Sequence, residues 1–309
     1  MIVTILLHSA TGNTRLVTRY AAARLAAAGH RCVVHDIVRQ PALPSLDDVD
    51  LLGVACPTMY FRPTFAMERC VAGLPAARRP PCPAFLLGTA GGEPGAHFEI
   101  LAQRLEDKGY RALGAHWVIS PDSWPLHHSA VRPLASLTPL LERLVPLGPR
   151  ALRAWWALGW PGVGAPDRRD RARLDAFLDR VVAATDAPGS PRTAPPPHRL
   201  HRASLYLDRV GRMIAREKIE PYARPRFDAA RCDGCATCVV SCPARAIVQA
   251  SERAVPTVGD GCTGCFACYN RCPTGAIAAF GCPAGRAQYR GPSRGMRDLF
   301  SVAGSSSDE

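Results

Sequence analysis

Two stretches with the same spacing decide the fold of the C-terminal part: CDGCATCVVSCP at residues 232–243 and CTGCFACYNRCP at residues 262–273. Each has three cysteines at intervals of three residues, then a fourth cysteine followed by proline. The repeat recurs after thirty residues and extends to an Ala-Ile pair, Ala246-Ile247 and Ala276-Ile277. A duplicated unit of this length predicts a small pseudo-symmetric domain.

The cysteine spacing indicates two 4Fe-4S clusters. Three closely spaced thiolates can wrap one cubane, while the fourth, leaving beside its proline, reaches the other site. The predicted ligand sets are Cys232, Cys235, Cys238 and Cys272 for the first cluster, and Cys262, Cys265, Cys268 and Cys242 for the second. Zinc is the alternative, because paired CxxC elements also occur in zinc sites. Zinc would not explain two triplets that are each completed by Cys-Pro.

Over about residues 227 to 280, this pattern closely resembles the bacterial-type two-cluster ferredoxin domain. The resemblance implies low-potential electron transfer. Five further cysteines lie outside the repeat, namely Cys32, Cys56, Cys70, Cys82 and Cys282. We interpret the four in the first domain as buried, unreactive thiols, whereas Cys282 is also followed by proline but has no partner triplet.

The first part of the chain alternates apolar runs with helical patterns. The predicted strands span residues 2–8, 32–38, 51–56, 84–88 and 112–119, and the predicted helices span residues 14–28, 63–71 and 97–108. This order implies βαβ units. The strands are nearly continuous apolar runs, as expected when helices cover both faces of a parallel sheet. We therefore predict one doubly wound parallel sheet of five strands.

A polar loop directly follows the first predicted strand and opens the first predicted helix. It offers hydroxyls, an amide and backbone N–H groups to a phosphate. The loop resembles the flavodoxin phosphate signature (S/T)xTGNT, matched at Ser9, Thr11, Gly12, Asn13 and Thr14. The alternative is an ordinary strand-to-helix turn capped by Thr or Asn.

Two later loops fit the same resemblance, which implies bound FMN. Thr58, Met59 and Tyr60 follow the third strand, where flavodoxins place groups that contact the isoalloxazine ring. Thr89, Gly91 and Gly92 follow the fourth strand, where small residues let the backbone approach the ring. Flavodoxins usually stack an aromatic side chain from that loop, so this sequence predicts one open flavin face. Trp124 is either a substitute cover or a core residue.

The whole chain resembles the flavodoxin-ferredoxin fusion family. The resemblance implies a flavodoxin-like α/β domain followed by a small α+β bacterial ferredoxin-like domain. We expect an FMN-binding domain at residues 1–185 with a helical extension at 148–185, a Pro-rich linker and helix at 186–225, the cluster domain at 226–284, and a disordered tail at 285–309. Within the extension, the apolar periodicity predicts an amphipathic helix at 167–184, with Asp167 as its N-cap.

The net charge of +12 comes almost entirely from arginine, because all but two of the 38 Lys and Arg residues are arginines. They are scattered and interleaved with acidic residues, which argues against a nucleic-acid partner. A basic face for an acidic redox partner and an ordinary solvated face both remain open.

The sequence carries no signal peptide pattern and no run long enough to span a membrane. We expect a cytoplasmic protein, in which thirteen cysteines indicate metal or redox use. The Trp-rich stretch at residues 151–160 suits either packing on its own domain or peripheral membrane contact.

The leading functional prediction is an electron transfer protein that relays electrons between two 4Fe-4S clusters and FMN. No acid-base constellation is evident, because His8, His97 and His116 are dispersed. A first alternative is a flavin-dependent reductase of a quinone or another small acceptor, fed by its own clusters. A second alternative is a ferredoxin with a flavin-free docking domain.

Overall fold

The computed structural model describes residues 1–121, 123, 166–186, 209, 224–279, 282–285 and 288–302. The predicted linker, Trp124, the Trp-rich stretch at 151–160 and the first part of the helical extension lie outside these residues. Among the helices described, none is both long and apolar enough to cross a bilayer.

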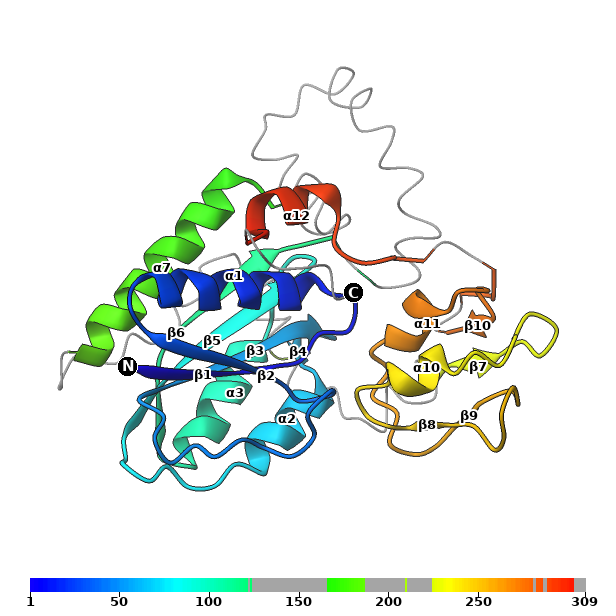
Figure 1. Ribbon diagram of the computed structural model, residues 1–309, viewed down its shortest axis with the longest axis horizontal. Coiled ribbons are helices and arrows are strands. Elements are labelled where there is room, and N and C mark those ends of the chain that lie inside the picture. Colours follow the sequence, from blue (N-terminus) through cyan, green and yellow to red (C-terminus); the bar gives the residue numbers. More distant parts are fainter. Residues whose placement is uncertain are drawn as a thin grey trace, which may run out of the picture.

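The N-terminal part contains one six-stranded sheet (Figure 1). Its parallel strands are β1 (Ile2–Leu7), β2 (Arg31–Asp36), β3 (Leu51–Met59), β5 (Cys82–Ala90) and β6 (Tyr110–Ile119). They lie in the order β2-β1-β3-β5-β6, and the short β4 (Arg62–Pro63) pairs antiparallel with β3. Without β4 this is the 2-1-3-4-5 order of the flavodoxin-like fold. The predicted doubly wound sheet is therefore confirmed.

Helices cover both faces of the sheet (Figure 1). The first face carries α1 (Asn13–Ala27), α7 (Arg168–Asp186) and α12 (Arg294–Phe300), and the second carries α2 (Phe65–Ala72) and α3 (His97–Glu106). Successive strand residues point to opposite faces. Ile5 and Leu7 accordingly join the first core, with α1 and α7, while Leu6 joins the second core, with α2 and α3. This sheet with its helices is called the sheet domain below.

Helix α7 is present where the apolar periodicity predicts it. The carboxylate of Asp167 accepts hydrogen bonds from the backbone N–H of Arg169 at 2.7 Å and of Asp170 at 3.0 Å. These are free donors of the first helical turn, so Asp167 acts as the predicted N-cap. Leu174 and Phe177 are buried against the sheet domain.

The prediction of a disordered tail from residue 285 is wrong for residues 294–300, which form α12. Its N-cap Ser293 accepts a hydrogen bond from the backbone N–H of Met296 at 3.3 Å. Met296 and Phe300 have no exposed surface, because they pack into the core beside α1 and α7. Met296 and Phe300 are the two buried residues of a seven-residue helix, and two residues are too few to form a recognisable apolar periodicity in the sequence.

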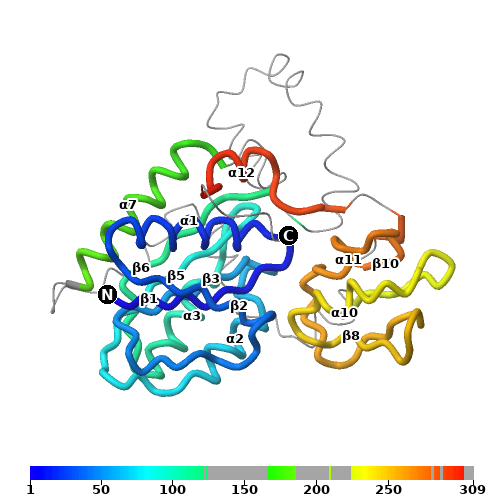
Figure 2. Tube along the Cα trace, viewed as in Figure 1, coloured from blue at the N-terminus to red at the C-terminus, as the bar shows by residue number. Residues whose placement is uncertain are grey.

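The C-terminal cysteines lie in a small separate lobe, called the cluster lobe here (residues 224–285). It contains two antiparallel strand pairs and two short helices, namely β7 (Arg226–Phe227) with β10 (Ile277–Ala278), β8 (Ile247–Val248) with β9 (Thr257–Val258), α10 (Thr237–Val240) and α11 (Ala267–Arg271). The lobe sits beside the carboxyl ends of the parallel strands (Figure 2). This is the edge at which open α/β sheets bind ligands.

Candidate functional site

The eight repeat cysteines surround two cavities in the crossed arrangement predicted from their spacing. One cavity, called the outer cluster site, is lined by Cys232, Cys235, Cys238 and Cys272. The other, called the inner cluster site, is lined by Cys242, Cys262, Cys265 and Cys268. Each site thus takes three cysteines from one run and the fourth from the other, which ties the two halves of the lobe together.

The two cysteine runs also share their backbone conformation. Gly234 and Gly264 have φ angles of 70° and 61°, and Ala236 and Phe266 have φ angles of 58° and 57°. Left-handed backbone at a residue other than glycine costs about 1 to 3 kcal/mol and tends to occur at functional sites. The N–H of Ala246 donates to Cys242 Sγ at 3.3 Å, and that of Ala276 donates to Cys272 Sγ at 3.2 Å. The fourth cysteine of each run therefore accepts the same backbone hydrogen bond, which stabilises a thiolate.

The cavities fit iron-sulfur cubanes better than zinc. Four thiolates bound to one zinc ion lie about 2.3 Å from it and leave no space between them. Here each set of four cysteines lines a cavity together with other residues, and within the described part of the chain no three or more His, Cys, Asp or Glu side chains converge as ligands of one metal ion. Burial, and then the neighbouring cysteines, raise the pKa of Cys238 to about 11. Iron, when bound, would supply the positive charge that converts such thiols to thiolates.

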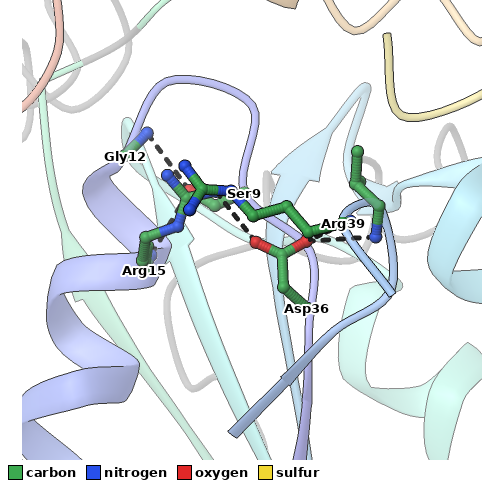
Figure 3. A network of polar contacts seen from close by, with 6 residues as sticks. Ser9, Gly12, Arg15, Asp36 and Arg39 are labelled. Atoms are coloured by element: carbon green, nitrogen blue, oxygen red, sulfur yellow. Dashed lines mark hydrogen bonds and ion pairs between the residues drawn. The ribbon is translucent and has the colours of Figure 1, made fainter. Parts of the chain in front are cut away.

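The predicted phosphate loop (residues 9–14) turns sharply into α1 (Figure 3). Ser9 Oγ accepts hydrogen bonds from the backbone N–H of Gly12 at 3.1 Å and of Arg15 at 3.3 Å. Gly12 has a φ of 101°, which only glycine adopts without strain. The loop thereby directs the first turn of α1 toward the strand ends, where a helix N-terminus favours an anion.

An ion pair supports this loop from the side. Arg15 Nη2 lies 2.9 Å from Asp36 Oδ2 at the end of β2, and both side chains are largely buried (Figure 3). Burial opposes ionisation of Asp36, yet hydrogen bonds from Arg15 and from the backbone N–H groups of Val38 and Arg39 keep the pKa of its carboxyl below the usual value. The pair therefore links the start of α1 to the end of β2.

A pocket of ≈ 370 Å³, partly open to solvent, lies at the strand ends. Eight of the predicted flavin-site residues line it: Ser9, Thr11, Asn13, Thr14, Thr58, Met59, Thr89 and Gly91. Gly12, Tyr60 and Gly92 are not among its lining residues. The hydroxyl oxygens of Thr14 and Thr89 are 2.7 Å apart, which joins the phosphate loop to the end of β5.

The side chain of Tyr60 is directed into the cluster lobe rather than into this pocket. Its hydroxyl donates to the carbonyl oxygen of Gly264 at 2.8 Å, and its ring meets that of Phe266 edge to face, with centroids 6.4 Å apart. Tyr60 and Phe61 have φ angles of 56° and 61° at the tip of the β3–β4 hairpin. Such a turn usually takes Asn-Gly. The contacts of Tyr60 with Gly264 and Phe266 offset the backbone strain of the left-handed conformation at Tyr60 and Phe61.

Met59 and Ala10 connect the strand-end pocket to the inner cluster site. Met59 lines the strand-end pocket and also a smaller one shared with Cys265. Ala10, in the phosphate loop, packs with Met59, Cys265 and Ala267. Cys265, at the inner cluster site, therefore lies in apolar contact with the wall of the predicted flavin site.

Two fully buried histidines support the strand ends. His97 Nδ1 lies 3.0 Å from Thr58 Oγ1, and His97 Nε2 lies 3.6 Å from Cys56 Sγ. His8 Nδ1 lies 3.0 Å from Thr64 Oγ1. Burial lowers the pKa of His97 to about 3 and that of His8 to about 4. Both imidazoles are therefore neutral hydrogen-bonding groups at physiological pH.

We expect the free energy of unfolding to fall on acidification because of these histidines. In the unfolded chain they bind protons near pH 6.5, whereas in the folded protein they remain neutral to about pH 3 or 4. Their stabilising effect is thus fully present above the unfolded pKa and is lost as the pH falls. Between about pH 7.5 and about pH 5.5, the free energy of unfolding should fall by about 1.4 kcal/mol for each of the two histidines. Thermal unfolding midpoints over this interval measure the effect.

The matched variant is His97→Asn, which keeps a polar side chain but cannot be protonated. It should lose less stability than the wild type over the same pH interval. An equal pH dependence in the two proteins would contradict the assignment to His97.

Three contacts of this site carry no sequence signal. Asn13 lines the pocket, but both polar atoms of its side chain have protein partners: Nδ2 donates to the Pro121 carbonyl at 3.1 Å and Oδ1 accepts from Tyr289 Oη at 2.6 Å. Asn270 Nδ2 donates to the Ser123 carbonyl at 2.9 Å. The sequence analysis does not predict Tyr289 or Asn270 as site residues, because each forms a hydrogen bond to a residue far away in the sequence.

Comparison with known proteins gives one family match. Residues 224–273 match the model of the 4Fe-4S dicluster domain. No curated protein matches the chain.

Solved structures with similarity to the chain include a flavodoxin of Streptococcus pneumoniae, at 12% identity and a TM-score of 0.37, covering 60% of this chain and 99% of that one. A second is the NAD(P)H:quinone oxidoreductase of Methanothermobacter marburgensis, at 13% identity and a TM-score of 0.27, covering 38% and 74%. A third is a flavone reductase, at 12% identity and a TM-score of 0.37, covering 62% and 66%.

The chain thus combines a flavodoxin-like fold, seen in its strand order, with a 4Fe-4S domain. This combination indicates redox chemistry, either electron transfer or flavin-dependent reduction.

Proposed function

We propose that the chain is an electron carrier in which two 4Fe-4S clusters and one FMN form a relay. The observation that carries the proposal is the apolar contact of Cys265, at the inner cluster site, with Met59 and Ala10 in the wall of the strand-end pocket. In this arrangement Cys242, Cys262, Cys265 and Cys268 would hold the cluster nearer the flavin, and the outer site would hold the cluster farther from it. Bound clusters would supply single-electron transfer between these sites.

The residues of this chain would hold the cofactors and exclude water between them. Thr11, Thr14 and the first turn of α1 would bind the FMN phosphate, while Thr58, Thr89 and Gly91 would line the ring. FMN, when bound, supplies exchange between single-electron and two-electron chemistry. Cys265 and Cys268 are only 9% and 8% exposed, so this side of an inner cluster would be shielded from water.

The outer site is the better entry point for a redox partner, because Cys235 is exposed there. A partner protein would approach the lobe at Cys235. The net positive charge of the chain favours an acidic partner.

The composition of anaerobically purified protein tests the relay. We expect about eight iron and about eight sulfide atoms per chain, with about one FMN, and an absorbance spectrum with broad cluster bands beneath resolved flavin bands. Iron and sulfide without flavin would favour a flavin-free docking domain. Zinc without sulfide would overturn the cluster assignment.

A flavin-dependent reductase is the second candidate, favoured by Gly91 in the wall of a pocket that is partly open to solvent. A small acceptor such as a quinone could approach a flavin at this glycine. Turnover with a panel of quinones and reduced ferredoxin as donor distinguishes the two functions. Acceptor reduction no faster than the background rate would exclude the reductase.

Tyr60→Phe should slow electron transfer between the inner cluster and the flavin. The substitution keeps the ring but removes the hydrogen bond to Gly264, which is worth about 1 kcal/mol, so the docked arrangement loses population. We expect the rate of flavin reduction after rapid cluster reduction to fall by about threefold to tenfold, measured by stopped-flow absorbance. Tyr110→Phe is the control, because Tyr110 Oη bonds to the Pro75 carbonyl at 3.4 Å, within the sheet domain.

A further inference from the structure

The segment that follows the cluster lobe, residues 288–293 (the strap), returns across the phosphate loop before α12 begins (Figure 2). Tyr289 in the strap is only 7% exposed. A Cβ added at Gly12 would lie 2.9 Å from Pro292 Cδ, so the strap and the phosphate loop are in direct contact. The chain therefore leaves the sheet domain, forms the lobe and comes back to the predicted flavin site.

Four hydrogen bonds join these parts, and the covalent backbone between Pro121 and Ser123 completes a ring. Tyr289 Oη donates to Asn13 Oδ1 at 2.6 Å, and Asn13 Nδ2 donates to the Pro121 carbonyl at 3.1 Å. The backbone N–H of Tyr289 donates to Asn270 Oδ1 at 2.8 Å, and Asn270 Nδ2 donates to the Ser123 carbonyl at 2.9 Å. The ring closes because Pro121 and Ser123 are only two positions apart, directly after β6.

The ring connects the predicted flavin site to helix α11, which contains Cys268 and has Cys272 as its C-cap. Asn13 is the first residue of α1, whose N-terminus faces the pocket. Asn270 lies in α11, between Cys268 and Cys272. The side chains of Asn13, Asn270 and Tyr289 are 5%, 1% and 7% exposed, so their hydrogen bonds cannot be exchanged readily for bonds to water.

We propose that Tyr289 is a positioning residue for FMN, which fixes Asn13 and the start of α1 to the docked cluster lobe. This inference rests on the FMN binding proposed above. A phosphate at the start of α1 requires its backbone N–H groups to converge. Since Tyr289 and Asn270 hold that turn only when the lobe is docked, FMN binding and lobe docking stabilise each other reciprocally.

The first test is the FMN dissociation constant of Tyr289→Phe, measured on cluster-loaded full-length protein by the quenching of flavin fluorescence. Loss of one hydrogen bond to a buried amide should weaken FMN binding by about tenfold. The control is Tyr20→Phe, because Tyr20 also donates from a buried position, to Asp175 at 2.6 Å, but lies on α1 outside the ring. It should bind FMN as the wild type does.

The second test asks whether the effect passes through the ring. Asn270 is not among the residues that line the strand-end pocket, yet Asn270→Ala should weaken FMN binding, with iron content unchanged. The double variant Tyr289→Phe with Asn270→Ala should bind FMN about as weakly as the weaker single variant. Both substitutions break the same ring of hydrogen bonds, so their effects on FMN affinity should not add.

Each outcome bears on the proposal. Wild-type affinity in Tyr289→Phe would overturn it and leave the electron relay intact, because the wild type would still bind FMN. Fully additive losses of FMN binding free energy in the double variant would also overturn it, because two contacts that act independently have additive effects. A wild-type protein that binds clusters but no FMN would overturn both the relay and this inference.

Discussion

Cys272→Ala should abolish the outer cluster and leave the inner one, although Cys272 belongs to the second cysteine run. Its side chain lines the cavity of Cys232, Cys235 and Cys238. Iron content should fall from about eight to about four atoms per chain. Flavin reduction by the remaining cluster should stay fast, because the inner site is the one in contact with the strand-end pocket.

Cys242→Ala is the reciprocal variant and should show the opposite kinetics. It should lose a similar amount of iron, but flavin reduction should become slow, since the cluster next to Met59 would be missing. If each run instead held its own four ligands, the two kinetic results would be exchanged. Iron analysis combined with stopped-flow reduction therefore distinguishes crossed from uncrossed ligand sets.

Cys282→Ala provides the matched control. Cys282 is only 3% exposed and packs in the core of the lobe, yet it lines neither cluster cavity. Its replacement should leave about eight iron atoms per chain. Loss of a cluster in this variant would show that any disturbance of the lobe core releases iron, and the results for Cys242 and Cys272 would then not identify ligands.

The sequence predicts the elements of this protein whose information is local. Cysteine spacing constrains the loop around a cluster directly. Each of the five parallel strands is recognisable from its own apolar run, without information about the strands beside it. The phosphate loop is equally local, since Ser9 Oγ and Gly12 lie three positions apart in one turn. The predicted strands, the first helices and α7 are all present for this reason.

Features that depend on the docking of the lobe could not be predicted. Tyr60 follows β3 as expected, but the left-handed backbone of Tyr60 and Phe61 turns its ring toward Phe266. The partners Asn13 and Tyr289 are separated by 276 positions. Propensity and periodicity describe only neighbours along the chain, so neither contact leaves a pattern in the sequence.

Gly12→Ala should lower the affinity for FMN by about a hundredfold or more. Gly12 has a φ of 101°, and a Cβ there would lie 2.9 Å from Pro292 Cδ, so both the loop and the strap must shift. The N–H groups of the phosphate loop would then no longer converge on the phosphate. Charge-assisted hydrogen bonds are worth about 1.5 to 3 kcal/mol each, and losing two of them corresponds to at least a hundredfold. Flavin fluorescence titration measures the dissociation constant.

Gly29→Ala separates this effect from backbone strain alone. Gly29 follows the C-terminal end of α1 with a φ of 87°, and a Cβ there would meet nothing within 4 Å. Both variants should lose about 1 kcal/mol or more of stability from left-handed alanine, but only Gly12→Ala should lose FMN. Equal affinity in the two variants would mean that the phosphate is held elsewhere. If only Gly12→Ala loses FMN affinity, FMN binding needs the conformation of the phosphate loop itself, because both alanines have a similar left-handed backbone.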